Sequence, residues 1–258
     1  MISGQNIKNE TAKSFETIAD KTRQDVFIFG DHASNHIPGE FDNLGLSGED
    51  LTRHIAWDIG TERIIRRLCE KIGCAGQLAA VSRLVIDLNR DVSSDSLIPE
   101  MTDATTVPGN SGLSELERQK RIEDYHESYH RHLGKMIETL GKPFVISVHS
   151  FTPKPRHGDL RATEIGLLVK EDTESAENLR QSLADSNNDF NVGINLPYSA
   201  YDLNYTIDRH VTPRGLPHLA IEIRQDHINT DKKAEAMADI LVDCLLPVIQ
   251  KALAHLSP

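Results

Sequence analysis

Cysteine, aromatic residues and long apolar runs are all scarce in this sequence. Three cysteines, Cys69, Cys74 and Cys244, occur in 258 residues, and aromatic residues make up 5%. Because the cysteines are odd in number and lack CxxC spacing, the sequence excludes a zinc knuckle and a redox pair, and we expect reduced thiols. No stretch approaches the roughly 20 consecutive apolar residues of a membrane span, and no basic segment precedes an apolar core at the N-terminus. We therefore expect no membrane association and a cytoplasmic protein.

Positive charge is also scarce. The chain has 28 Lys and Arg residues against 39 Asp and Glu residues, a net charge of −11. Proteins that neutralise phosphates have the opposite balance, so we expect no nucleic-acid partner. The length suffices for one large core, and no Pro/Gly/Ser-rich linker divides the chain. We predict an N-terminal arm over residues 1–24 and a single α/β domain over residues 25–258.

Short runs rich in aliphatic or β-branched residues are spread along the chain and predict strands. The clearest are residues 26–30, 84–88, 143–149 and 218–223, with further candidates at 76–81, 164–169 and 190–194. The last two are close together in sequence, so we expect an antiparallel portion or an edge of the sheet there. The loop over residues 91–113 has no periodicity, and so long a loop in a compact domain is more often functional than idle.

Helical patterns separate these runs. They cover residues 47–73, 114–141, 172–185 and a stretch from 231 past Pro247, where we expect a kink or a break. Alternation of strands and helices predicts a mainly parallel sheet covered on both faces. We therefore predict an α/β fold: one three-layer domain with a mainly parallel mixed sheet and helices on both faces.

Two isolated histidines, His32 and His149, each follow or end an apolar run. Ligands of open α/β sheets bind beyond the carboxyl ends of the strands, so both histidines are candidates for the site. Two histidines at equivalent strand ends indicate zinc or another divalent ion. For the third ligand we favour Asp58, beside the only Trp, over Asn35, because an amide is a poor zinc ligand. The alternative interpretation of Asp58 is an N-cap of the helical segment that follows it.

Asn89 and Arg90 end the 84–88 run, and Arg83 precedes it. The guanidinium fork of arginine matches carboxylate geometry, so the Asn89–Arg90 pair suits a substrate carboxylate. Arg83 could polarise a scissile carbonyl or hold a second carboxylate. Asp87 could orient an arginine or a metal-bound histidine. These residues predict a site for an anionic small molecule.

Glu222 lies within the otherwise apolar run of residues 218–223. An unpartnered carboxylate is costly to bury, so Glu222 either forms a salt bridge, for example with Arg224, or faces the site. If it faces the site, burial would raise its pKa toward the working range of a general base.

Two further groups of residues are less certain. His126 and His130 are four apart on a predicted helix, but they lie on the flank of its apolar stripe, so we favour a surface or pocket-edge role over a second metal site. Arg209 and Arg214 belong to a cationic loop before the Glu222 run, which could grip the distal end of an anionic substrate or form a basic surface turn.

Five blocks of sequence, in order, resemble the N-formylglutamate amidohydrolase family. They are Asp31–Pro38, Trp57–Asp58, Ser82–Arg90, Val148–Phe151 and Ala220–Ile223. The resemblance covers most of the chain and implies hydrolysis of an N-acyl, typically N-formyl, amino acid on an α/β fold like that of zinc carboxypeptidases and other zinc exopeptidases.

A more distant resemblance to zinc carboxypeptidases and aspartoacylases implies roles for individual residues. Asn89 and Arg90 would hold the substrate carboxylate, Arg83 would lie near the carbonyl, Glu222 would be the catalytic carboxylate and His149 a metal ligand. Those enzymes carry His-x-x-Glu where this sequence has His32-Ala33-Ser34-Asn35. The missing carboxylate again favours Asp58 as the third ligand.

The resulting hypothesis is a zinc hydrolase in which Glu222 deprotonates a zinc-activated water and Arg83 helps to stabilise the oxyanion. The substrate would be a small anionic N-acyl amino acid, with N-formyl-L-glutamate, which yields formate and L-glutamate, as the first choice. Arg209 or Arg214 would read a side-chain carboxylate. The alternatives are a carboxypeptidase or another N-acyl amino acid amidase and, outside the enzymes, a metal-free ligand-binding protein of the same fold. The oligomeric state is not predicted.

Overall fold

The computed structural model describes residues 14–19 and 22–255. In these residues, seven strands form one sheet in the order β1-β3-β2-β6-β9-β7-β8. The strands are β1 (Phe15–Ile18), β2 (Arg23–Gly30), β3 (Cys74–Ala79), β6 (Phe144–Phe151), β7 (Ile165–Leu168), β8 (Val192–Ile194) and β9 (His218–Arg224). The central strands β3, β2, β6 and β9 are mutually parallel, whereas β1 and β7 pair antiparallel with β3 and β9. The mainly parallel mixed sheet is therefore confirmed, as is the antiparallel portion at the edge.

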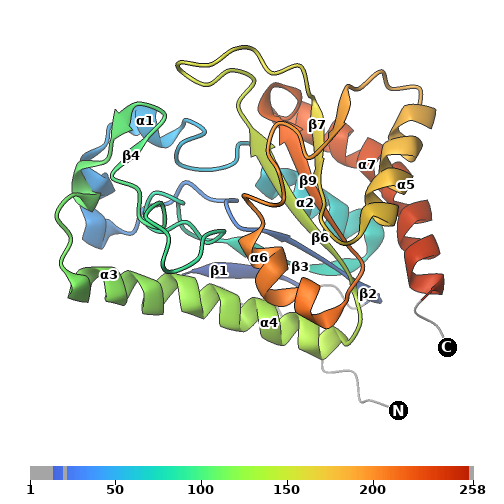
Figure 1. Cartoon of the computed structure of the whole chain (residues 1–258), viewed down its shortest axis with the longest axis horizontal. Coiled ribbons are helices and arrows are strands. Elements are labelled where there is room, and N and C mark those ends of the chain that lie inside the picture. Colours follow the sequence, from blue (N-terminus) through green and yellow to red (C-terminus); the bar gives the residue numbers. More distant parts are fainter. Residues whose placement is uncertain (1–13, 20–21, 256–258) are drawn as a thin grey trace.

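Helices cover both faces of the sheet (Figure 1). On one face lie α2 (Thr61–Ile72), α5 (Thr173–Asp185) and α7 (Asp231–Ala254). On the other face lie α3 (Glu115–Arg121), a π-helical turn (Ile122–Glu127), α4 (Ser128–Leu140) and α6 (Tyr205–His210). Smaller elements are α1 (Gly48–Leu51), the hairpin strands β4 (Met101–Thr102) and β5 (Thr105–Thr106), and 3-10 turns at Gly39–Gly45, Pro108–Asn110, Thr212–Arg214 and Gln225–His227. The predicted three-layer domain is confirmed.

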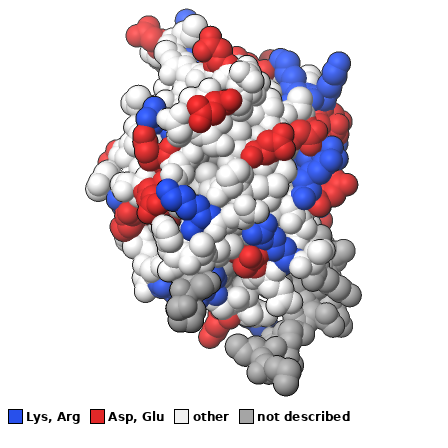
Figure 2. Space-filling model, turned by 90° about the vertical axis from the view of Figure 1, so that its right-hand side faces the viewer, with Lys and Arg blue, Asp and Glu red and all other residues white. Residues whose placement is uncertain are grey.

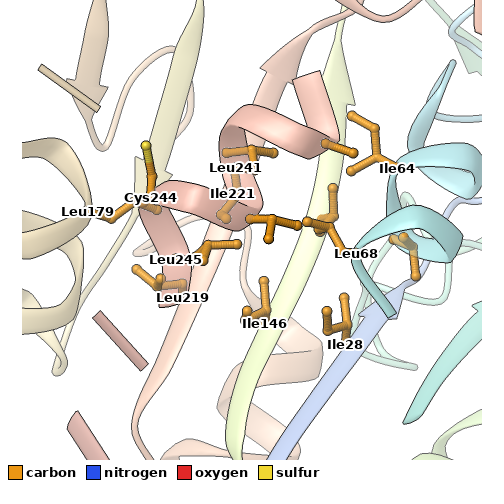
Figure 3. Close-up of a cluster of buried hydrophobic side chains, with 14 of the residues drawn as sticks. Ile28, Ile64, Leu68, Ile146, Leu179, Leu219, Ile221, Leu241, Cys244 and Leu245 are labelled. Carbon is orange, nitrogen blue, oxygen red and sulfur yellow. The ribbon is translucent and has the colours of Figure 1, made fainter. Parts of the chain in front are cut away.

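Each face of the sheet has its own apolar core, because side chains alternate along a strand. Ile28 of β2 packs into the cluster that includes Ile64 and Leu68 of α2 and Leu241 of α7 (Figure 3). Its neighbours Phe27 and Phe29 belong to the opposite cluster, with Tyr129 of α4 among its members. The parallel strands are thus buried from both sides, and their carboxyl ends remain open for polar residues.

The apolar run at residues 84–88 is not a strand, contrary to the prediction. It is an irregular segment whose backbone bonds are local or reach a loop: Val85 N donates to Ser82 O and Asp87 N to Leu97 O, at 2.9 and 2.7 Å. Leu84 and Leu88 are fully buried. The apolar composition correctly predicted that this segment is buried, but its backbone hydrogen bonds are formed outside the sheet.

The helix predicted over residues 47–73 is divided into α1 and α2, with turns over 52–60. Gly60 precedes α2 with φ +87°, and a Cβ placed there would lie 2.3 Å from Ile228 O. Only glycine fits this backbone, and the turn ends the irregular segment that carries Asp58. The division therefore frees Asp58 from a helix and places it beside the strand ends.

Two other predictions need correction. The C-terminal helix continues through Pro247 without a break, and Leu245, Val248 and Ile249 around this proline are buried. Burial of these side chains offsets the hydrogen bond that proline cannot donate. Part of the predicted arm over residues 1–24 belongs to the sheet, because β1 pairs with β3 at the sheet edge. Residues 1–13 and 20–21 of that arm lie outside the described residues.

The three cysteines are free and buried, as expected. No helix among the described residues is both long enough and apolar enough to cross a membrane. On the side of the molecule that lies at the right of Figure 1, acidic and basic side chains are interspersed (Figure 2).

Candidate active site

A pocket of about 150 Å³ lies at the carboxyl ends of the central strands. The residues around it come from parts of the chain far apart in sequence. Seven of those singled out from the sequence line it: His32, Asp58, Arg83, Asn89, Arg90, His149 and Glu222. The topology explains this convergence, because the carboxyl ends of parallel strands meet at one edge of the sheet.

His32, Asp58 and His149 form a compact, buried group of potential metal ligands. One donor atom from each residue lies within 4.8 Å of the donor atoms of the other two. Asp58 Oδ2 is 2.9 Å from His149 Nδ1 and 3.5 Å from His32 Nδ1. His32 Nδ1 is buried and has no hydrogen-bond partner in the described part of the chain. Two imidazoles, one carboxylate and an unpartnered ring nitrogen aimed at the group fit a divalent ion such as zinc.

A carboxylate also holds the far nitrogen of each histidine. Asp87 Oδ1 lies 2.8 Å from His32 Nε2, and Asp31 Oδ2 lies 3.5 Å from His149 Nε2. Such outer carboxylates fix the ring orientation and the tautomer of metal-binding histidines. This role was predicted as one possibility for Asp87, but not for Asp31. The signal was present, since Asp31 is an acidic residue directly after the buried strand β2.

The charges of this cluster are strongly coupled. Burial lowers the pKa of His149, but Asp31, Asp58 and Glu222 outweigh it and raise that pKa well above 6.5. For His32, burial and Arg83 lower the pKa, while Asp87 and Asp58 more than compensate and raise it. Burial alone would raise the pKa of Asp58, yet His32 and His149 hold it well below its usual range. Without a metal, the site would therefore hold protons on its histidines, and a cation would replace them.

The contacts support neither Asn35 as the third ligand nor an N-cap role for Asp58. The Asn35 side-chain amide donates to Leu51 O at 2.9 Å. The N-cap of α2 is Gly60, and its cap has no side-chain hydrogen bond. The carboxylate of Asp58 instead contacts His149 and accepts the backbone N–H of Ser150 at 3.3 Å.

Glu222 lies beside His149 in the sheet, where the two residues are register partners on the parallel strands β6 and β9. Its side chain is buried, and Oε2 has no hydrogen-bond partner in the described chain. Burial raises the pKa of Glu222 to about 7, although His149 acts in the opposite direction. The salt-bridge alternative is not seen, because Arg224 pairs with Glu164 and Asp226. A buried carboxylate of this kind can take up and release a proton near neutral pH.

Arg83 bridges two carboxylates at the pocket wall. Its guanidinium donates to Asp87 Oδ2 at 2.6 Å and to Asp58 Oδ1 at 3.4 Å. Both carboxylates outweigh the effect of burial and raise the pKa of Arg83. Arg83 is therefore a fixed positive charge beside the metal-ligand group.

The Asn89–Arg90 pair faces the same pocket. The amide oxygen of Asn89 accepts a hydrogen bond from Thr206 N at 3.0 Å, which leaves the amide nitrogen to donate to a ligand. Arg90 donates to Ser96 Oγ and to Asn89 O, and no carboxylate pairs with it in the described residues. An uncommitted guanidinium beside an amide donor can receive a carboxylate.

Arg209 and Arg214 do not line the pocket, contrary to the prediction that they read the distal end of the substrate. Arg209 forms a two-pronged ion pair with Glu127, at 3.0 and 2.8 Å. Arg214 donates to His210 O at 2.7 Å. Sequence proximity to Glu222 was misleading, because the turn between them carries both arginines to the opposite end of β9.

His126 and His130 are buried, contrary to the predicted surface role, and they lie outside the group of His32, Asp58 and His149. Both are fully buried, and both form hydrogen bonds with backbone carbonyl oxygens of the segment that carries the Asn89–Arg90 pair. His130 Nε2 lies 2.8 Å from Leu88 O, and His126 Nε2 lies 2.9 Å from Arg90 O. A carbonyl oxygen only accepts, so each Nε2 carries the proton and donates. The two histidines hold that segment in place.

Comparison with known proteins places this geometry in a family. The profile described as N-formylglutamate amidohydrolase matches residues 25–229. A crystal structure of a gene product from Agrobacterium tumefaciens is 32% identical, with a TM-score of 0.86, and the alignment covers 93% of this chain and 96% of that one. No curated protein matches in sequence.

A second solved structure shows the same fold at lower identity. It is N-formylglutamate amidohydrolase from Ralstonia eutropha JMP134, which is 16% identical, with a TM-score of 0.69 and coverage of 94% of this chain and 99% of that one. The profile match spans every candidate site residue discussed above, from Asp31 to Glu222.

Proposed function

The chain belongs to the N-formylglutamate amidohydrolase family, and from this premise we propose that it is a metal-dependent hydrolase of N-acyl amino acids, with N-formyl-L-glutamate as substrate. The reaction would yield formate and L-glutamate. One observation carries the proposal: a buried His32, Asp58 and His149 group, a buried Glu222 and the Asn89–Arg90 pair all face one pocket. A cytoplasmic location stays a prediction, in keeping with three free cysteines.

We assign the metal to His32, Asp58 and His149, with Asp87 and Asp31 as the outer carboxylates. A bound zinc ion would polarise the acyl carbonyl and lower the pKa of water to about 7. The chain's own contribution is to present both imidazoles as neutral ligands in fixed orientations.

Glu222 is the group proposed to move the proton. Its unpartnered Oε2 would accept a proton from the attacking water and then deliver it to the leaving amide nitrogen. The water oxygen joins the acyl carbon, the C–N bond breaks, and the amine leaves with the proton that Glu222 carried. Arg83 would stabilise negative charge that develops on the carbonyl oxygen, since its own charge is fixed by Asp58 and Asp87.

Asn89 and Arg90 would orient the substrate. The Asn89 amide nitrogen and the Arg90 guanidinium together offer donors for both oxygens of an α-carboxylate. Because this pair lies in the same pocket as Glu222, anchoring the carboxylate would direct the acyl group toward the metal ligands. This arrangement favours a single amino acid with a free α-carboxylate.

The test is a substrate panel with metal analysis. Purified protein supplied with zinc is expected to release formate from N-formyl-L-glutamate, to lose this activity after chelation and to regain it when zinc is returned. N-acetyl-L-glutamate and dipeptides with C-terminal glutamate serve as rivals. Preference for the dipeptides would indicate a carboxypeptidase, and a protein that neither binds zinc nor hydrolyses any of the panel would support a binding protein instead.

A further inference from the structure

The far end of the substrate needs a different partner from the two arginines that the sequence suggested. Arg209 and Arg214 are engaged with Glu127 and with His210 O, away from the pocket. Arg83 is held by Asp58 and Asp87 beside the metal-ligand group, where the proposed function uses it at the carbonyl oxygen. Arg90 is needed at the α-carboxylate in the proposed function. A dicarboxylic substrate would therefore require another cation at the pocket wall.

Arg161 lies against three residues that line the pocket. Its guanidinium carbon is 4.8 Å from the centre of the Tyr198 ring and 5.5 Å from the centre of the Phe151 ring. The same guanidinium donates to Thr152 O at 3.1 Å. Tyr198, Phe151 and Thr152 all belong to the pocket lining. Arg161 is not itself a lining residue, so its positive charge lies beside this part of the pocket wall.

The charge of Arg161 is not committed to an acidic residue. No carboxylate pairs with Arg161 anywhere in residues 14–19 and 22–255, and its guanidinium donates to the neutral carbonyl of Thr152. A guanidinium has five N–H donors, so most of its capacity remains available. Stacking on aromatic rings leaves the edge of the guanidinium plane free to bind a carboxylate in two-pronged fashion.

The backbone around Arg161 is fixed. Arg161 N donates to Pro153 O at 2.8 Å, which closes the base of the loop after β6, and Arg224 donates to Arg161 O at 3.0 Å. This loop extends past the carboxyl end of β6 at the top of the molecule (Figure 1). A charge at the base of an anchored loop costs less conformational entropy to position than one at its tip.

His54 lines the pocket and is close enough to Arg161 to feel its charge, so it is a second candidate for positive charge at that end. Burial lowers its pKa, and the nearby Asp103, at 3.4 Å, only partly opposes this. His54 is therefore neutral at pH 7. Arg161 is left as the permanent charge on this side of the pocket.

We propose that Arg161 is the specificity residue that receives the side-chain carboxylate of a dicarboxylic N-acyl amino acid. Asn89 and Arg90 then hold the α-carboxylate, and Arg161, beside Tyr198, holds the distal one. The inference rests on the proposed function and deepens it, because it explains how glutamate would be told from glutamine. Glutamine carries an amide where glutamate carries a carboxylate, so the two substrates differ in charge but not in size.

The experiment compares N-formyl-L-glutamate with N-formyl-L-glutamine in the zinc-loaded wild type and in Arg161→Gln. The wild type is expected to prefer the glutamate substrate in kcat/KM by about 10- to 100-fold, the range for a hydrogen bond to a charged group. Arg161→Gln is expected to abolish this preference, mainly through KM, and to leave turnover of the glutamine substrate within about threefold. Arg161→Lys, which keeps the charge without the fork, should restore part of it.

Arg156→Gln is the matched control, since Arg156 is an exposed arginine of the same loop that contacts Ala104 O. It should keep the wild-type preference. Binding of the products L-glutamate and L-glutamine, measured by calorimetry, gives a second readout that does not depend on turnover. A melting temperature close to that of the wild type shows that Arg161→Gln is folded.

The outcomes separate the two proposals. If the wild type hydrolyses neither substrate with zinc supplied, the proposed function fails and this inference fails with it. If the wild type hydrolyses both equally, or if Arg161→Gln keeps the preference for glutamate, the function stands and the role of Arg161 is overturned.

Discussion

The protein contains two groups of buried histidines that are nearly equal in burial and opposite in chemistry. Carboxylates surround His32 and His149. Asp87 and Asp58 raise the pKa of His32, and Asp31, Asp58 and Glu222 raise the pKa of His149. His126 and His130 donate to backbone carbonyls, and His130 contacts His210. One carboxylate, Glu127, lies 3.4 Å from His126 Nδ1, yet burial still lowers the pKa of all three histidines.

The difference shows that partners, rather than burial or spacing, decide what a buried histidine does. His130 and His210 stack with ring centres 5.2 Å apart, and His130 Nδ1 lies 3.0 Å from His210 Nε2. Both ring nitrogens of His130 thereby have partners, Nδ1 with His210 and Nε2 with Leu88 O beside the Asn89–Arg90 pair. His32 Nδ1 and His126 Nδ1 both lack a hydrogen-bond partner among the described residues. The first lies 3.5 Å from Asp58 Oδ2 in the metal-ligand group, whereas His126 and His130 donate through Nε2 to carbonyl oxygens.

The largest effect is expected when the carboxylate shared by His32 and His149 is removed. Asp58→Asn is expected to abolish zinc binding and turnover, because a neutral amide is a poor ligand and both histidines lose their shared carboxylate. Metal content by mass spectrometry and formate release measure this. Asn35→Ala is the control and should keep its zinc. Full zinc occupancy in Asp58→Asn would remove Asp58 from the ligand set.

A second change separates metal binding from proton transfer. Glu222→Gln should retain zinc but lower kcat by about 10²- to 10⁴-fold, the usual contribution of a general base. The wild type should lose activity as the pH falls through about 7, since burial raises the pKa of Glu222 to about 7 and only its ionised form accepts a proton. Wild-type kcat in Glu222→Gln would mean that another group moves the proton.

The second histidine group predicts a pH dependence of stability. The pKa of His210 is lowered from 6.5 to about 4 in the folded protein, chiefly by burial. The unfolded chain therefore takes up a proton first, and stability is lost as the pH falls from about 6.5 to about 4. Linkage limits this loss to about 3 kcal/mol. Urea unfolding of metal-free wild type and His210→Gln across this range should show a smaller loss in the variant; equal slopes would rule out His210 as the source.

The smallest expected effect concerns the segment that the second group holds. His130→Ala removes the shorter of the two hydrogen bonds to Leu88 O and leaves only the bond from Thr206 Oγ1, at 3.4 Å, which costs about 1–3 kcal/mol of stability. The Asn89–Arg90 pair loses its support, so KM should rise by about 10-fold, while kcat stays within about threefold, because interactions with the bound acyl group are unchanged. Gln119→Ala, an exposed change on α3, is the control. A fall in kcat at constant KM would place His130 in the chemistry instead.

The sequence was sufficient to predict the site residues that lie on or directly after a strand. His32, His149 and Glu222 each stand at the end of, or within, an apolar run, and parallel pairing makes such positions converge. The distal arginines were not predictable in this way. Arg209 and Arg214 precede β9, at the end of the strand opposite to Glu222. They were selected because they are close to Glu222 in sequence, and that closeness does not place them in the pocket. Arg161 lies in a loop without periodicity and carried no signal.

The sequence by itself determined the fold class, the strands β2, β6 and β9 and the types of residue at their ends, because these depend on local apolar periodicity and on composition. It did not determine the conformation of residues 84–88, whose apolar side chains report burial but whose hydrogen bonds depend on residues distant in sequence. Only the tertiary structure decided which histidines meet carboxylates and which meet carbonyls. Those partners come from other strands and loops, and contacts between them exist only once the chain is folded.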